Sequence, residues 1–173
     1  MSHDLEKLVN DVVKQVLGAE TSDVKSAPAK TAKNSMTKMT LSAAKKTIEA
    51  VEKKAAEIGV KAVTAISDAG GNPIAVESMD DAFIASYDIA VNKAFTVVSL
   101  KMPTKNLATL AAPGGSLYGI QFTNNGKIII FGGGEPLTNK DGVILGGLGV
   151  SGGTAEQDTL LGEYGKAFFE NLI

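Results

Sequence analysis

The stretch 19–37 restricts the fold of this chain more than any other feature. Its only large apolar residues are Val24 and Met36, and the rest is mostly Ala, Ser, Thr, Lys and Asn. Such a composition cannot bury enough apolar surface to offset the entropy of an ordered chain. We therefore predict a flexible linker over residues 19–38. One segment precedes it, and a folded domain follows over residues 39–173.

The segment before the linker, residues 1–18, has the pattern of an amphipathic helix. Polar side chains separate large aliphatic residues that recur at helical spacing, and Gly18 is typical of a helix end. The aliphatic stripe consists of Leu5, Leu8, Val9, Val12, Val13, Val16 and Leu17. Because an isolated helix of this length is marginal in water, the stripe predicts a docking partner.

Charge helps to choose among partners for this helix. A secretory signal would have a basic start and an uninterrupted apolar run, which this segment lacks. A membrane-surface helix would favour basic residues, but Asp4, Glu6 and Asp11 stand against Lys7 and Lys14. Docking onto another protein fits better. The alternatives are that the helix folds back on its own domain or pairs with a second copy in a coiled coil.

This order of aliphatic helix, linker and compact domain resembles the encapsulation peptides of enzymes packaged in bacterial microcompartments. The resemblance covers residue 1 to about residue 35. It implies that residues 1–18 bind shell or cargo proteins, and that the protein is cytoplasmic, inside a microcompartment.

Bulk composition excludes several classes of protein. The 173 residues, 44% of them hydrophobic, suffice for one domain with a core. A net charge of -2, with mixed signs along the chain, argues against nucleic acid as a partner. No apolar run approaches the ~20 residues that span a bilayer. The absence of cysteine excludes disulfides and thiolate catalysis and suits a reducing cytoplasm.

Apolar periodicity in the body predicts alternating helices and strands. Helices are expected over residues 40–58, 84–101 and 154–172, with a short helical turn over 104–110. Strands are expected over residues 61–67, 73–77, 117–123, 127–131 and 142–150.

Two turn sequences suggest how these strands pair. Residues 68–72 (DAGGN) and 124–126 (NNG) each separate two strand-like runs and are typical of hairpins. Hairpins outnumber crossovers, so we predict a mostly antiparallel five-stranded sheet with flanking helices, which is an α+β fold.

Residues 149–153 match the GxSxG pattern of a nucleophile elbow at a strand-to-helix turn. A serine hydrolase also needs a base, and the only histidine is His3, before the linker. The favoured interpretation is therefore structural: the glycines turn the chain, and Thr154 with Gln157 caps the next helix. Free N–H groups at residues 151–153 could still bind a carboxylate or phosphate.

A second glycine cluster, residues 132–136, lacks the Lys-Ser/Thr pair of a phosphate loop. It suits close backbone approach to a ligand or a neighbouring subunit. Lys93 lies on an apolar helix face near Asp88 and Asn92. Its amine either extends to solvent or binds an acidic ligand. No set of His, Cys, Asp or Glu has metal-ligand spacing, so no metal is predicted.

Four segments together resemble the GlcG/HbpS-like family, which includes the C-terminal domain of the propanediol-utilisation protein PduO. The resemblance spans residues 39–172, and the segments are 68–73 (DAGGNP), 88–96 (DIAVNKAFT), 132–137 (GGGEPL), and 147–153 (GLGVSGG) with Asp158. It implies a profilin-like fold and homo-oligomers from dimers to octamers. In several members it also implies binding of heme or another tetrapyrrole. Many members are encoded beside enzymes of glycolate, glycerol or propanediol metabolism.

The body departs from the heme-binding members because it contains no histidine. The remaining candidate iron ligands are lysines, hydroxyls and the following side chains: Tyr87, Tyr118, Tyr164, Met79 and Met102. A pocket for a small organic acid or aldehyde is an equal alternative.

These patterns lead to three functional hypotheses. The first is a microcompartment cargo protein whose oligomeric body binds a small ligand or heme. The second is an enzyme acting on a small aldehyde or hydroxy acid through Lys93 with Ser151 or Asp158, although no general base is identified. The third is a ligand-free scaffold. The predicted ligand-binding residues are Lys93, Gly133, Gly134, Pro136, Ser151, Gly152 and Asp158.

Overall fold

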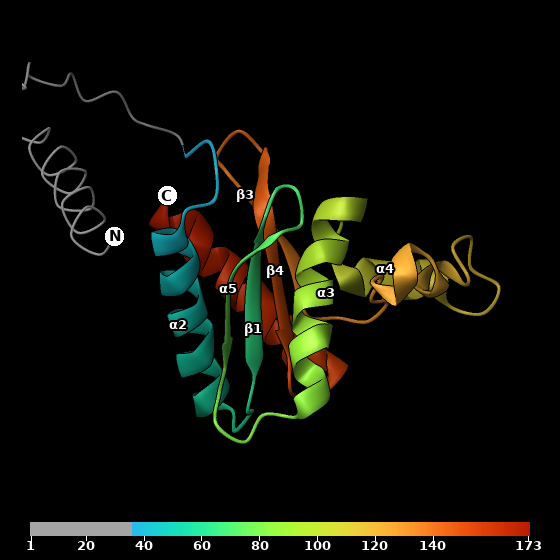
Figure 1. The fold of residues 1–173 in the computed structure, drawn as a ribbon, viewed down its shortest axis with the longest axis horizontal. Helices are drawn as coiled ribbons and strands as arrows, with labels where there is room; N and C mark the ends of the chain where they lie inside the picture. Colours follow the sequence, from blue (N-terminus) through green and yellow to red (C-terminus); the bar gives the residue numbers. More distant parts are fainter. Residues whose placement is uncertain (1–35) are drawn as a thin grey trace, which may run out of the picture. The chain divides into compact units, whose positions relative to one another are not determined.

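The computed structural model describes residues 36–173, and the predicted docking helix lies outside them. One antiparallel sheet has the strand order β2-β1-β4-β3 (Figure 1). Its strands are β1 (Val63–Asp68), β2 (Pro73–Ser78), β3 (Gly134–Thr138) and β4 (Ile144–Ser151). The helices are α2 (Leu41–Glu57), α3 (Ile84–Leu100), α4 (Thr104–Ala111) and α5 (Ala155–Leu172). Two 3-10 turns, η2 (Ile120–Phe122) and η3 (Asn124–Gly126), follow α4.

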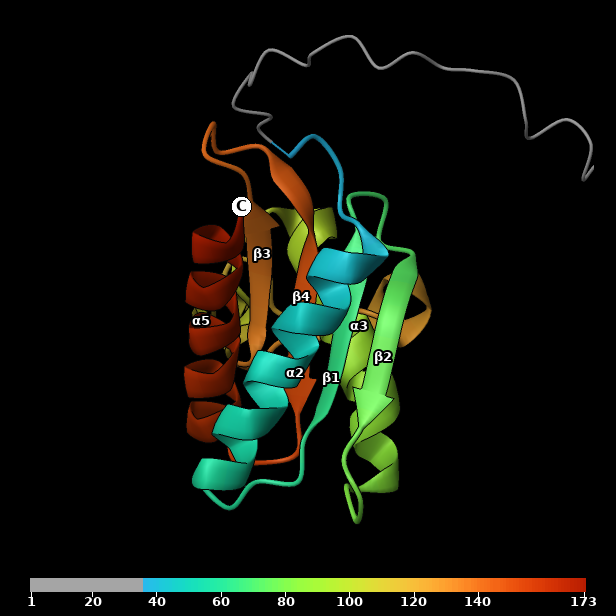
Figure 2. The same cartoon turned by 90° about the vertical axis from the view of Figure 1, so that its left-hand side faces the viewer.

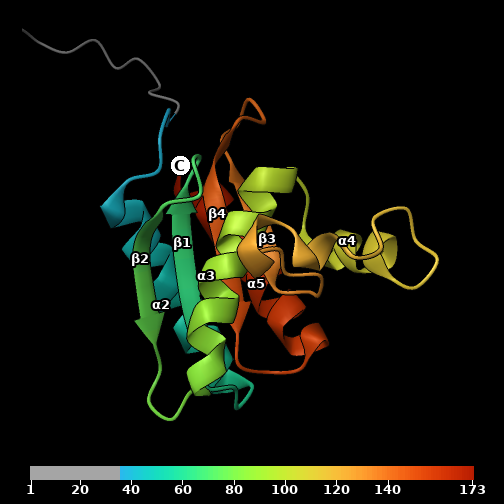
Figure 3. The same ribbon diagram turned by 45° about the vertical axis from the view of Figure 1, so that its right-hand side comes forward.

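Helices cover both faces of the sheet. Figure 2 shows α2 and α5 on one face, and Figure 3 shows α3 crossing the other. The α+β class and the antiparallel sheet predicted from the sequence are therefore confirmed. Among residues 36–173, no helix combines the length and apolar character that crossing a membrane requires.

Capping and apolar periodicity explain the long helices. The Thr40 hydroxyl accepts a hydrogen bond from the Ala43 N–H at 3.2 Å and begins α2. Thr154 and Gln157 form the predicted capping box at the start of α5. Both helices turn their apolar residues onto the sheet, where Ile48, Val51, Ile66, Leu148, Val150, Leu161 and Phe169 form part of one core cluster.

The β1–β2 connection is a hairpin, as its sequence predicts. The Asp68 carboxylate accepts hydrogen bonds from the N–H groups of Gly70 at 2.8 Å and Asn72 at 2.9 Å. The hydrogen bonds from Asn72 and Gly70 hold the pKa of this carboxyl below its usual range. The strands pair in antiparallel register from Val63 opposite Ser78.

The second predicted hairpin is wrong. Asn124 and Asn125 do adopt the left-handed conformation that a tight turn needs, but the turn lies in η3. Residues 127–129 instead bond to a side chain of α3: the Thr96 hydroxyl lies 3.2 Å from the Lys127 carbonyl oxygen and accepts from the Ile129 N–H at 3.0 Å. Neither 117–123 nor 127–131 is a strand: the first contains the 3-10 turn η2, and in the second the Thr96 side chain bonds to the backbone where a neighbouring strand would.

The second glycine cluster, residues 132–136, leads into a strand that the apolar pattern of the sequence did not predict. Residues 134–138 form β3, an edge strand paired with β4 from Gly134 opposite Gly149. The sheet thus has four strands rather than five, since two predicted strands are absent and one was missed. Glycine and proline at the start of β3 obscure it in the sequence, yet proline is tolerated at a sheet edge.

Candidate functional site

Lys93, in the middle of α3, is the centre of the candidate site. Its side chain is fully buried, so it does not extend to solvent. The ammonium donates to Asp158 Oδ2 at 2.8 Å and to the Val150 carbonyl oxygen at 2.7 Å. It also lies 4.7 Å from the centroid of the Phe131 ring. This one cation thus joins α3 to β4, to α5 and to the segment that leads into β3.

The carboxylate of Asp158 joins this cation to the start of α5. Its Oδ1 accepts from the Gly153 N–H at 2.9 Å, while Oδ2 accepts from Lys93. Thr154 and Gln157 satisfy each other's N–H groups. The helix N-terminus therefore already holds an anion, which is the protein's own. The predicted external carboxylate or phosphate at residues 151–153 would have to displace it, and that binding remains a prediction.

Gly133 lets the chain pass directly over the Lys93 amine. Its φ of 110° is left-handed, and an added Cβ would lie 2.7 Å from Lys93 Nζ and 2.6 Å from the Val150 oxygen. Its own carbonyl accepts from the Val150 N–H at 2.8 Å. No side chain could occupy this position without moving the amine.

Burial disfavours the charged forms of both Lys93 and Asp158. Desolvation lowers the pKa of the Lys93 amine, although the Asp158 charge works against it. Desolvation likewise raises the pKa of Asp158, against the attraction of Lys93 and the hydrogen bond from Gly153. Both shifts bring the pair closer to exchanging a proton. A buried amine beside a proton acceptor is the arrangement used by nucleophilic lysines.

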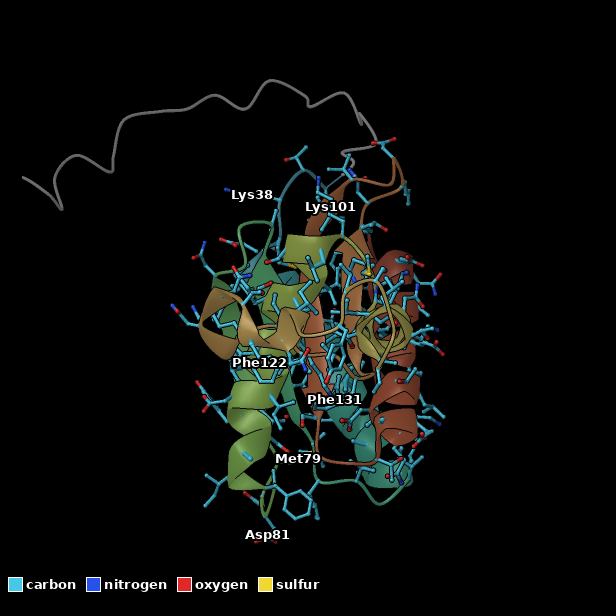
Figure 4. The ribbon with its side chains drawn as sticks, turned by 90° about the vertical axis from the view of Figure 1, so that its right-hand side faces the viewer. Lys38, Met79, Asp81, Lys101, Phe122 and Phe131 are labelled. Carbon is cyan, nitrogen blue, oxygen red and sulfur yellow. The ribbon has the colours of Figure 1, made fainter. Side chains whose placement is uncertain are left out.

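A surface cavity of about 430 Å³ is lined by Phe131, the residue whose ring also contacts Lys93. The cavity lies between α4, the chain before β3 and the first turns of α5, and Figure 4 shows Phe131 between α3 and α5. Its lining consists of Lys105, Ala108, Phe131, Gly132, Ala155, Glu156, Thr159, Leu160 and Glu163. The Phe131 ring therefore separates the buried amine from the cavity.

The other predicted site residues lie farther along the same strands. The Gly134 N–H donates to the Thr104 hydroxyl at 2.9 Å, and Pro136 pairs with Gly147. The Ser151 hydroxyl is buried and donates to Ser86 at 3.2 Å. Lys93, Gly133 and Asp158 thus form a single cluster, with Gly152 at the adjoining turn. Phe131 was missed, although its place before three glycines could have drawn attention to it.

Glu135 is a second buried charged residue that the sequence analysis did not select. It lies on β3, and its nearest cation is Lys166 of α5, 3.7 Å away. Burial raises the pKa of Glu135, while Lys166 and Lys105 partly oppose the shift. Lys105 itself pairs with Glu163 at the edge of the cavity. Within residues 36–173, no three His, Cys, Asp or Glu side chains gather as a metal site.

The segment that begins with α4 carries exposed aromatic residues. We call residues 104–127 the arm, because α4, η2 and η3 project beside α3 in Figures 1 and 3. Tyr118 is 67% exposed and Phe122 83% exposed. Between them, the side-chain oxygen of Gln121 is buried without a hydrogen-bond partner in the described structure. A surface with these features can hold a planar aromatic ligand or another protein.

The sequence matches one family model. The family is described as "Haem degrading protein HbpS-like", and the match covers residues 39–166. The chain is 48% identical over 134 residues to an "Uncharacterized 15.0 kDa protein in dhaT-dhaS intergenic region" of Citrobacter freundii. This match covers 78% of the chain and 94% of that protein.

A longer relative matches over part of its length. The chain is 40% identical over 109 residues to the corrinoid adenosyltransferase PduO of Salmonella typhimurium. The match takes in 63% of the chain but only 32% of PduO, so the chain spans about a third of that relative.

Two solved structures share the fold. The Klebsiella pneumoniae protein ORFY has a TM-score of 0.73 and 44% identity, covering 86% of this chain and 97% of ORFY. A structure described as the "PduOC:Heme Complex" has a TM-score of 0.72 and 35% identity, covering 75% of this chain and 94% of that one.

Proposed function

The chain belongs to the HbpS-like family, and from that premise we propose that it is a microcompartment accessory protein whose body binds heme or a related tetrapyrrole. The observation that carries this proposal is the likeness of its fold and sequence to the PduOC:heme complex. The profilin-like description of the body, and a role beside propanediol or glycerol metabolism, belong to the same proposal.

Among the described residues, a tyrosine oxygen is the iron ligand that fits heme best. They include no histidine, and the Met79 sulfur is already engaged by the Ala62 N–H at 3.4 Å. The phenol of Tyr118, by contrast, is exposed on the arm, which also exposes the ring of Phe122. A tyrosine oxygen is an established heme ligand, and exposed rings stack on planar groups. We therefore assign the heme contact to the arm, with Tyr118 as the iron ligand. Bound heme would supply an iron centre for electron or oxygen chemistry.

A visible absorption titration of the full chain with hemin tests this assignment. We expect a saturable Soret shift of defined stoichiometry, lost in Tyr118→Phe and retained in the matched control Tyr87→Phe. Tyr87 is a suitable control because it is also an exposed phenol, but it lies on α3. A shift no larger than that of an unrelated protein would reject heme binding. The third hypothesis, a ligand-free scaffold, would then gain weight.

Self-association forms part of the proposal. The start of α3 exposes Phe83 (72%), Ile84 (97%) and Tyr87 together. Three exposed large apolar side chains so close together in the sequence favour an interface. We propose that it joins copies of the chain into a dimer or larger ring. Light scattering after gel filtration should show a smaller species for Ile84→Asp, while an unchanged mass would exclude this patch.

Targeting is proposed for the N-terminal segment. The amphipathic pattern of residues 1–18 suits binding to a shell or cargo protein. Deleting these residues should release the protein from purified microcompartments without changing hemin binding by the body. A matched control replaces Leu8 and Val12 by aspartate in the intact chain, which removes the apolar stripe but keeps the length. Continued co-purification of both variants with intact shells would reject targeting.

A further inference from the structure

We propose that Phe131 gates a carbonyl-binding site in which the amine of Lys93 forms an imine with a small apolar aldehyde. The proposal goes beyond heme binding and does not depend on it, because it concerns the cavity and the buried amine. The hemin titration can therefore fail while this proposal holds, and the reverse is equally true.

The first step of the argument is the position of the Phe131 ring. The ring lies over the Lys93 ammonium, with 4.7 Å between the nitrogen and the ring centroid. The same side chain lines the cavity of about 430 Å³. Because one ring contacts both, its displacement would open the cavity to the amine. A cavity of this volume lies within the usual range for small-molecule sites.

The partial exposure of Phe131 leaves its side chain room to move. The ring is 38% exposed, so one edge already meets solvent. Gly133 and Gly134, by contrast, are held by hydrogen bonds to Val150 and Thr104, so the movement belongs to the Phe131 side chain and not to the backbone. A ligand that fills the cavity could take the place of the ring against Lys93.

Asp158 supplies the acid–base chemistry of imine formation. The Lys93 ammonium transfers a proton to Asp158 Oδ2, 2.8 Å away, which burial favours for both groups. The neutral amine attacks the aldehyde carbon and forms a carbinolamine. Asp158 returns its proton to the carbinolamine hydroxyl, which leaves as water, and the product is a protonated imine beside the Asp158 carboxylate. One aldehyde and one ammonium thus give one protonated imine and one water, without an oxidant or reductant.

The cavity lining selects the class of carbonyl compound. Ala108, Ala155 and Leu160 supply apolar walls, which suit a short alkyl chain. Glu156 and Glu163 outnumber Lys105 on the lining, so its net negative charge would repel a carboxylate. An uncharged aliphatic aldehyde is therefore preferred over an aldehyde that also carries an acid group.

Reductive trapping on the full chain tests the site. The protein is treated with dilute butanal and cyanoborohydride, and the alkylation rate of each of its 17 lysines is measured by peptide mass spectrometry. We expect Lys93 to react measurably faster than exposed Lys45, because burial lowers the pKa of the Lys93 amine and its proton can pass to Asp158, 2.8 Å away. Glyoxylate, which carries a carboxylate, should show no such preference for Lys93.

Alkylation rates in variants show whether the Phe131 ring controls access to Lys93. Phe131→Ala should increase the rate at Lys93 further, whereas Phe122→Ala, which removes an exposed ring on the arm, should not change it. Asp158→Asn should slow the reaction if its circular dichroism matches wild type. The proposal is overturned if wild-type Lys93 reacts no faster than Lys45, whatever the Phe131 variant does. A rate at Lys93 that Phe131→Ala leaves unchanged would also overturn the gate.

Discussion

Large aliphatic side chains fill one face of the sheet, whereas on the other face backbone lies directly against backbone. Ile66, Leu148 and Val150 point toward α2 and α5 in the main core cluster. On the α3 face, a Cβ added to Gly149 would lie 2.0 Å from the Ala90 carbonyl oxygen. The contrast indicates a division of roles: the aliphatic face supplies stability, and the close packing of α3 on the other face brings Lys93 within reach of Asp158 on α5.

Breaking the buried pair should have the largest effect. Lys93→Met leaves the Asp158 carboxylate buried without its cation, which should cost about 3–5 kcal/mol of unfolding free energy. Denaturant unfolding measures the loss. Adding Asp158→Leu to Lys93→Met should recover most of it, since two apolar residues can replace a buried ion pair. A double variant no more stable than Lys93→Met would contradict this account of the α3 face.

Close backbone packing predicts the next effect. Gly149→Ala should destabilise the protein by about 1–3 kcal/mol or more, because α3 must move away from β4. Gly70→Ala is the matched control, as its neighbours are only the side-chain ends of Asn72 and Asp68. It should change stability by less than about 0.5 kcal/mol. Equal effects at the two glycines would show that α3 does not pack as closely as described.

The aliphatic face should respond more mildly to a small change. Ile66→Val removes one buried methylene between the sheet and α2, which should cost about 0.5–1.5 kcal/mol. Urea unfolding should show a lower midpoint with an unchanged slope. A loss larger than that of Gly149→Ala would reverse the proposed contrast between the two faces.

The smallest expected effect on stability is that of replacing Glu135, and it depends on pH. Burial raises the pKa of its carboxyl, so the folded chain holds this proton more tightly than the unfolded chain. The contribution of Glu135 to stability should therefore fall as pH rises above about 4.3, the ordinary glutamate value. Glu135→Gln removes this titration, so its stability relative to wild type should increase from pH 4 to pH 7. Urea midpoints at both values test the sign, and a fixed difference would contradict it.

Local sequence predicts the helices of this protein well. Regular apolar spacing and the Thr40 and Thr154 caps mark α2 and α5, and Pro103 falls just after α3. The hairpin at Asp68 is predictable for the same reason, since its side chain bonds within its own turn. These features depend on residues that are neighbours in the chain.

Features that depend on distant partners could not be predicted in this way. The conformations of Asn124 and Asn125 do suit a tight turn, but Thr96 of α3 takes the backbone partners of the expected strand. The edge strand β3 lacks apolar alternation. The pairing of Lys93 with Asp158 joins residues 65 positions apart, and only the fold brings them together. Lys93 and Asp158 could therefore be selected singly, but not as a buried pair.

Hydrogen–deuterium exchange of the full chain, with and without hemin, tests the proposed division of the molecule most directly. Because Tyr118 and Phe122 are exposed on the arm, we predict slower exchange in residues 112–127 when hemin is bound. Exchange in α2, on the aliphatic face, should stay unchanged. Protection that appears in α2 but not in the arm would contradict the assignment of ligand binding to the α3 side.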